Sequence, residues 1–199
     1  MINSIIKSFK KESLSQKALP IFLYLNFALI SYFFIDKTIA LYFHREKFLN
    51  PFFEFITFFG RSELYLVTSL LIFLIFKSQK AKIVFLSVAF SGILTDILKV
   101  IVGRYRPDML FEKGLYGFDW FHIKYEYISF PSGHAATAFS LFVALSSFFP
   151  RYKIALFILA SLIAFSRVEL NAHYLSDIIV GSLIGVLSAE FILKRAKKN

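Results

Sequence analysis

Residues 131–149 read PSGHAATAFSLFVALSSFF, and this stretch decides the fold class. After the turn Pro131-Ser132-Gly133-His134, the segment holds no charged residue and has the length that an α-helix needs to cross the hydrocarbon core of a bilayer. A titratable group at membrane depth is costly, so it is a candidate for a functional site. The stretch therefore predicts a membrane-spanning helix that begins at a site containing a histidine.

Five other apolar blocks of comparable length occur along the chain. Of the 199 residues, 57% are hydrophobic and the mean hydropathy is +0.65, whereas a soluble domain is usually less apolar. The expected fold is therefore an all-α integral membrane bundle of six transmembrane helices, in which residues 1–199 form a single membrane-embedded domain. The predicted spans are roughly 18–35, 60–76, 81–98, 131–149, 154–170 and 174–193.

Two segments beside the first two spans have less regular patterns. In residues 1–17 the apolar side chains fall on one helical face, which fits a short interfacial helix or, equally well, a disordered basic tail. These residues are too polar for a cleavable signal peptide, so the first span is expected to act as the insertion signal. Residues 39–59 are aromatic but interrupted by charges and by Pro51, and we expect an interfacial connection that does not span.

The distribution of the net charge of +10 predicts the topology. Thirteen of the 23 Lys and Arg lie in segments 1–17, 77–82, 150–153 and 194–199, which share one side and contain a single acid, Glu12. Because Lys and Arg of short loops stay in the cytoplasm, both termini are expected there. A basic excess distributed in this way indicates membrane lipids as partners and argues against nucleic acid.

With this topology, the candidate polar groups all fall on the outer side, whereas chance would scatter them over both sides. In the turn at Pro131, Ser132 is a preferred N-cap and Gly133 leaves backbone N–H groups open to close approach. The N-terminus of a helix attracts an oxyanion. Taken alone, the turn could equally be an ordinary cap beside an interfacial histidine, His134.

A second histidine lies before the last span. His173 and Asp177 are four residues apart, so on a helix they share a face. A carboxylate bound to one imidazole nitrogen fixes the tautomer and leaves the other nitrogen as a base, a ligand or a nucleophile. Asn171 would cap this helix. The alternative is a structural polar pair at a helix start.

Three cations, Lys99, Arg106 and Arg167, lie at helix ends on the same side. They match the three non-bridging oxygens of a phosphoryl group, which Arg binds bidentately and Lys binds as a point charge. The alternatives are that Lys99 and Arg106 only meet a helix dipole and that Arg167 snorkels to the interface.

Three further charged residues are candidates for supporting roles. Asp96 lies one turn before Lys99 and is expected to hold that lysine in place. Arg104 and Asp108 flank Arg106 and are expected either to bind a headgroup or to support Arg106. Ordinary surface charge and a buried structural pair are the alternatives.

A metal site is the competing chemistry. His134, His173 and Asp177 could form a set of two histidines and one carboxylate. The nearby cations would repel a divalent ion, and the chain has no Cys for thiolate ligands. We therefore expect neither a metal nor another cofactor.

Together these stretches resemble the three-part signature of the type 2 phosphatidic acid phosphatase superfamily. Lys99 begins a Lys-x6-Arg-Pro motif, Pro131 begins Pro-Ser-Gly-His, and Ser166 begins Ser-Arg-x5-His-x3-Asp. All three motifs are complete and in the family's order, and the six-span layout covers nearly the whole chain. The resemblance implies metal-independent hydrolysis of a phosphomonoester or diphosphate through a phosphohistidine.

The resemblance also implies a role for each matching position. His173 corresponds to the nucleophile, which Asp177 orients. His134 corresponds to the general acid for the leaving oxygen and then to the base that activates water. The phosphate-binding positions are Lys99, Arg106, Ser132, Gly133 and Arg167.

The predicted site lies at headgroup depth, so the expected substrate is a lipid phosphate that enters laterally from the membrane. The chain resembles bacterial lipid A 1-phosphatases, undecaprenyl diphosphate phosphatases and phosphatidylglycerophosphate phosphatases, and we favour the first. That reading places it in a bacterial inner membrane with the active site facing the periplasm. A lipid-to-lipid phosphotransferase of the same fold stays open, whereas an anion transporter would usually show repeats or interrupted helices, which we do not find. Nothing in the sequence indicates an oligomeric state.

Overall fold

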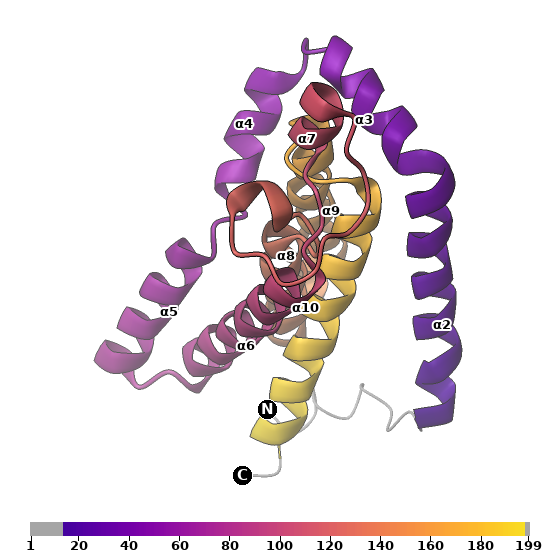
Figure 1. The fold of residues 1–199 in the computed structure, drawn as a ribbon. Helices are drawn as coiled ribbons and strands as arrows, with labels where there is room; N and C mark the ends of the chain where they lie inside the picture. The colour runs from indigo at the N-terminus through magenta and orange to yellow at the C-terminus, as the bar shows by residue number, and fades with distance from the viewer. Residues whose placement is uncertain (1–13, 198–199) are drawn as a thin grey trace.

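The computed structural model describes residues 14–197, and this part of the chain is helical without a named strand (Figure 1). The interfacial helix expected in residues 1–17 lies largely outside it. The α-helices are α2 (Leu14–Ile30), α3 (Asp36–Arg45), α4 (Asn50–Phe58), α5 (Ser62–Phe76), α6 (Gln79–Val102), α7 (Pro107–Lys113), α8 (Gly133–Phe148), α9 (Lys153–Glu169) and α10 (Leu175–Ala196). Short turns form η1 (Ser31–Ile35), η2 (Tyr125–Tyr127) and η3 (Pro150–Tyr152).

Within the described part of the chain, four helical segments are long and apolar enough to cross a membrane. They are Ala18–Arg45, Asn50–Phe76, Gln79–Val102 and Leu175–Ala196. The helix Gly133–Phe148 is apolar but shorter, and α9 lies beside it. The all-α membrane fold is confirmed, and the number of six spans stays a prediction.

The first helix differs from its predicted limits. The sequence placed the end of the first span at Asp36 and an interfacial connection at 39–59. In the structure a π-helical turn, η1, leads into α3, and α4 begins at Asn50, so only residues 46–49 connect the two helices. The helix continues to Arg45, past the predicted end of the span, because the Asp36 carboxylate is buried against an arginine and does not need to leave the helix for water.

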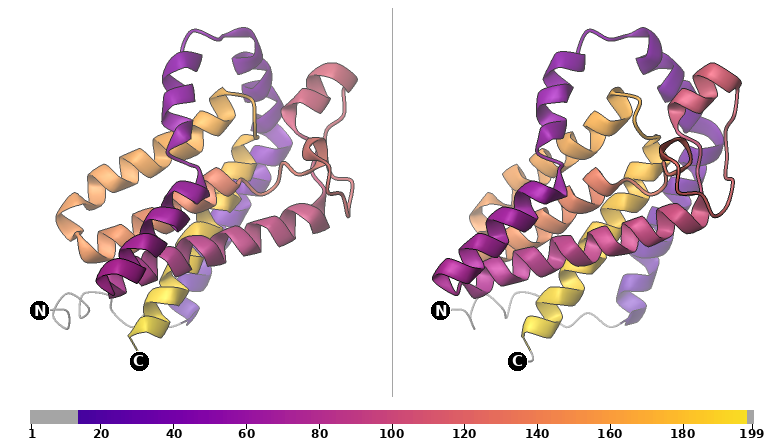
Figure 2. Two further views of the ribbon diagram at one scale, coloured as in Figure 1. Left: turned by 90° about the vertical axis from the view of Figure 1, so that its left-hand side faces the viewer. Right: turned by 60° about the vertical axis from the view of Figure 1, so that its left-hand side comes forward.

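Close contact between α8 and α10 positions the site. A Cβ on Gly181 would collide with the carbonyl oxygen of Ser132, and one on Gly185 would collide with that of Ala136. Small residues let the backbones of two membrane helices touch in this way. As a result the turn before α8 lies directly against the first turns of α10, in the middle of the bundle (Figure 2).

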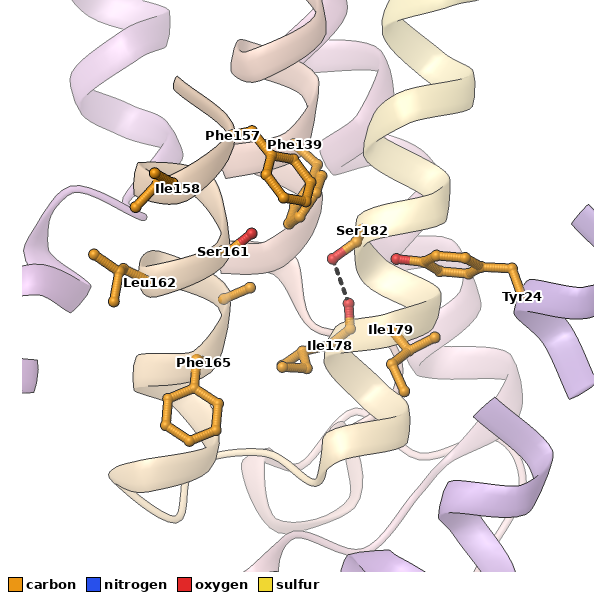
Figure 3. Close-up of a pocket in the computed structure, with 11 residues that line it drawn as sticks. Tyr24, Phe139, Phe157, Ile158, Ser161, Leu162, Phe165, Ile178, Ile179 and Ser182 are labelled. Atoms are coloured by element: carbon orange, nitrogen blue, oxygen red, sulfur yellow. Dashed lines mark hydrogen bonds between the residues drawn. The ribbon is translucent and has the colours of Figure 1, made fainter. Parts of the chain in front are cut away.

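The remaining helices surround this pair. The connection between α5 and α6 lies at the same end of the molecule as the C-terminal end of α10, whereas α7 and the connection between α3 and α4 lie at the other end (Figure 1). α2 packs against α10 but leaves a cavity of about 470 Å³ between itself and α9. Apolar side chains line this cavity, and Tyr24 points across it toward Ser182 of α10 (Figure 3).

Candidate active site

The predicted motif residues come together where α6 and α9 end and where α8 and α10 begin. Lys99 lies in the last turn of α6, and the turn at Ser132 opens α8. Arg167 lies in the last turn of α9, and His173 lies in the connection between α9 and α10. The backbone N–H of His173 donates to the carbonyl of Arg167 at 3.0 Å, so the third motif folds back on itself as a compact turn.

The turn before α8 has the predicted form. The hydroxyl of Ser132 accepts a hydrogen bond from the N–H of Ala135 at 3.4 Å and caps the helix. The N–H of Ser132 donates to the carbonyl of Asp177 at 3.1 Å. A Cβ on Gly133 would lie 3.3 Å from the Lys99 ammonium nitrogen, so a glycine here lets that cation approach the helix N-terminus.

His173 is buried, with 4% of its surface exposed, and its ring is held by a backbone group. Nδ1 lies 2.6 Å from the carbonyl oxygen of Ser129, which can only accept, so Nδ1 carries the proton. This leaves Nε2 unprotonated. Burial lowers the pKa of His173 to about 3. The imidazole is therefore neutral at neutral pH and offers a free lone pair.

Asp177 is arranged differently from the sequence-based expectation. Its Oδ2 lies 3.6 Å from Nδ1 of His173, which is too long for a hydrogen bond. Instead Oδ2 accepts from the hydroxyl of Ser129 at 2.6 Å and from the N–H of Tyr174 at 2.9 Å. The imidazole therefore bonds directly to the Ser129 carbonyl while the carboxylate lies at ion-pair distance, and the expected role of Asp177 in orienting His173 stays a prediction.

The guanidinium of Arg106 is fixed by backbone carbonyls from two separate loops. Its Nε and Nη1 donate to the carbonyls of Tyr125 and Ala172 at 2.8 and 2.6 Å, and Nη2 donates to Ile128 at 3.4 Å. The guanidinium also stacks 3.9 Å above the Tyr125 ring. A guanidinium has five N–H donors, so these three bonds hold the group in place and leave donors for an anion.

One side of the site is formed by the end of α4 and the turn that follows it. No motif in the sequence indicates this part of the site. Nη1 of Arg167 donates to the hydroxyl of Thr57 at 2.8 Å, while its buried Nε has no partner within residues 14–197. A Cβ on Gly60 would lie 2.5 Å from Cδ2 of His134, so the imidazole rests directly on the glycine backbone. The feature of the sequence that could have indicated this contact is Gly60 itself, which lies between an apolar segment and the charged Arg61.

The three supporting candidates have different positions. Asp96 forms the predicted ion pair with Lys99 at 3.2 Å. Asp108 is exposed in the first turn of α7, and its role stays a prediction. Arg104 neither binds a headgroup nor contacts Arg106, since it is fully buried and is paired with two carboxylates, Asp36 and Asp177. Of the alternatives for Arg104, the structure shows the buried structural pair, because the motif loop turns this side chain inward.

The site can thus bind a phosphate and attack it. A neutral imidazole with a free Nε2 lies in one turn with Arg167, and Lys99 lies beside the Gly133 helix N-terminus. Cations and backbone N–H groups of this kind stabilise the charge that a transferring phosphoryl group spreads over its oxygens. No group of three or more His, Asp or Glu that could hold a metal occurs in residues 14–197.

Comparison with known proteins identifies the family. The chain is 35% identical over 150 residues to a lipid A 1-phosphatase of Rhizobium johnstonii, a match that covers 66% of this chain and 62% of that protein. It is 41% identical over 101 residues to a lipid A 1-phosphatase of Rhizobium etli, covering 51% and 44%. The chain therefore spans less than two thirds of the length of these relatives.

Solved structures agree with this match. The crystal structure of Aquifex aeolicus LpxE superposes with a TM-score of 0.67 at 26% identity, covering 83% of this chain and 98% of that one. The first transmembrane PAP2 type phosphatidylglycerolphosphate phosphatase of Bacillus subtilis shares the fold, with a TM-score of 0.66 at 24% identity over 89% of this chain and 94% of that one. The model of the PAP2 superfamily matches residues 80–199, which hold all three motifs. The chain belongs to the PAP2 superfamily.

Proposed function

We propose that this protein is a membrane lipid phosphatase that removes phosphate from a lipid headgroup through a phosphohistidine, with lipid A phosphorylated at position 1 as its substrate. The observation that carries the proposal is the His173 imidazole, whose proton is fixed on Nδ1 by the Ser129 carbonyl so that Nε2 is free. The relatives that act on lipid A support the choice of substrate.

In the first step, Nε2 of His173 attacks the phosphorus atom and forms an N–P bond. The P–O bond to the lipid breaks, and the leaving oxygen takes a proton from His134. Lys99, Arg106 and Arg167 hold the three non-bridging oxygens, and the Gly133 N–H adds a donor at the helix N-terminus. Asp177 acts through Ser129, which keeps the Nδ1 proton in place.

In the second step, a water oxygen attacks phosphorus while His134 takes up one of its protons. The N–P bond breaks, orthophosphate leaves, and His134 is again protonated for the next cycle. The cations of the protein do the work that a divalent ion does in other phosphatases, so no metal enters either step. The active site faces the periplasm in this proposal, at the depth of the outer-leaflet headgroups.

The test is a substrate panel with the purified protein. Release of phosphate is followed from lipid A, prenyl diphosphates, phosphatidylglycerophosphate and phosphatidic acid, with and without an added acceptor lipid. We expect the highest kcat/KM on lipid A, with release of the 1-phosphate as orthophosphate. A higher kcat/KM on another member of the panel would reject lipid A as substrate. Transfer of the phosphate to the acceptor lipid in place of its release would reject hydrolysis.

A further inference from the structure

Arg104 connects two buried carboxylates that come from distant helices. Its Nη2 donates to Oδ2 of Asp36 at 2.8 Å, and its Nη1 donates to Oδ1 of Asp177. All three side chains are essentially inaccessible to solvent. Breaking one partner of a buried ion pair leaves an uncompensated charge, so each of the three charges depends on the other two.

Asp36 also fixes the beginning of α10. Its Oδ1 accepts from the backbone N–H of Ser176 at 3.0 Å and from the hydroxyl of Ser31 at 2.8 Å, and its Oδ2 accepts from the hydroxyl of Ser176. Ser176 lies in the first turn of α10, where N–H groups lack helical partners and a negative charge is favourable. A carboxylate at the beginning of α3 therefore caps the helix that carries Asp177.

The surroundings of Arg104 prevent it from turning toward a substrate. Its guanidinium carbon lies 4.5 Å from the centre of the Tyr174 ring, 5.0 Å from that of Tyr32 and 5.5 Å from that of Tyr116. The hydroxyl of Tyr116 bonds to the carbonyl of Tyr32 at 2.6 Å and closes this aromatic enclosure. Arg104 is thus held for a structural purpose beneath the site.

The contacts continue to the imidazole that the proposed mechanism uses. Asp177 accepts from the hydroxyl of Ser129, and the carbonyl of Ser129 accepts from Nδ1 of His173. The series of contacts from Asp36 through Arg104, Asp177 and Ser129 to His173 contains no gap. A displacement of Asp36 or Arg104 is therefore expected to move Asp177 and Ser129, and with them the imidazole of His173.

We propose that Asp36 is a positioning residue, which acts through Arg104 and Ser176 to hold Asp177 and the nucleophile His173 in the reactive arrangement. This inference rests on the proposed function. Asp36 lies outside residues 80–199, which the family model matches, so the first helix completes a site whose motifs all lie in the later part of the chain. Asp36 touches none of the phosphate-binding cations and should not affect phosphate affinity.

The test compares Asp36→Asn with Tyr24→Phe, a matched control on the same first helical segment that also faces α10 but lies away from the site. Rates are expressed per orthophosphate-binding site, so that a misfolded fraction of the protein does not count. Since a displacement of about 1 Å at a reacting group can cost 10²-fold, we expect Asp36→Asn to lower kcat by about 10- to 100-fold. We expect KM and orthophosphate inhibition to stay within about twofold and Tyr24→Phe to behave like wild type.

A second arm tests whether Asp36 acts through Arg104. Arg104→Gln leaves two buried carboxylates without their cation, and adding Asp36→Asn removes one of these charges. The double variant should therefore be at least as active per site as Arg104→Gln alone, whereas independent residues would give multiplied losses. Multiplied losses, or an Asp36→Asn protein with wild-type kcat, would overturn this inference and leave the proposed function intact.

A fall in orthophosphate affinity in Asp36→Asn equal to its fall in kcat would also overturn the inference, because it would show a general collapse of the site. An inactive wild-type protein would overturn the proposed function and this inference together.

Discussion

Replacing Gly60 by Ala should move the imidazole of His134 without removing it. The new Cβ would lie 2.5 Å from Cδ2 and 2.9 Å from Cγ of the ring, and 2.9 Å from a methyl group of Ile163. Carbon atoms in contact are about 3.5–4.0 Å apart, so the ring must retreat by about 1 Å. The methyl group of Ile163 crowds the same Cβ, so the new side chain cannot avoid the ring by moving toward Ile163.

The expected magnitude follows from this displacement. A shift of about 1 Å in a catalytic group can cost about 10²-fold in rate, and overpacking costs roughly 1–3 kcal/mol of stability. A general acid matters most for a poor leaving group. Gly60→Ala should therefore lose about 10²-fold in kcat on an alkyl phosphate and clearly less on an aryl phosphate.

The assay measures kcat for both substrates and thermal unfolding in detergent. Gly92→Ala is the matched control, because a Cβ at Gly92 meets no atom within 4 Å and alanine is favoured over glycine inside a helix by about 0.5–1 kcal/mol. Equal rates for Gly60→Ala and Gly92→Ala would refute the contact with His134. Equal losses on the two substrates would refute a role of this contact in acid catalysis.

Four further predictions concern the mechanism and the topology. His173→Ala should form no acid-labile phosphoenzyme in rapid-quench experiments, whereas His134→Ala should retain more activity on aryl than on alkyl phosphates; phosphoenzyme on His173→Ala would contradict the assignment. Activity should survive EDTA, and full loss that zinc or magnesium restores would show a metal requirement. Burial lowers the pKa of His173 from an ordinary value near 6.5 to about 3, so the nucleophile stays neutral between pH 7 and pH 5. The rate of single-turnover phosphoenzyme formation should therefore not fall over that range, and a fall centred near pH 6.5 would contradict the lowered pKa. Reporter fusions in the 108–128 loop and at Lys198 should report opposite sides of the membrane, and a cytoplasmic loop would invert the topology.

Much of the fold could be predicted because its signals are local. Hydropathy along a segment determines whether a helix can enter a bilayer, and the apolar blocks indicated α5, α6, α8 and α10 within a few residues. The cap at Ser132 was equally local, since a serine before an apolar helix bonds a nearby N–H. The first helix was predicted too short because a buried ion pair is not visible in the hydropathy of one segment.

The sequence by itself determined the chemical groups of the candidate site, since the three motifs contain both histidines, the carboxylate and the cations. Only the tertiary structure decided how these groups are held. Arg104 and Asp36 are 68 positions apart, and the contact of Gly60 with His134 joins the turn between α4 and α5 to α8. Such contacts depend on how whole helices pack, which no local pattern encodes. Packing also placed the Ser129 carbonyl closer to Nδ1 of His173 than the Asp177 carboxylate, and this decided which group fixes the tautomer of the proposed nucleophile.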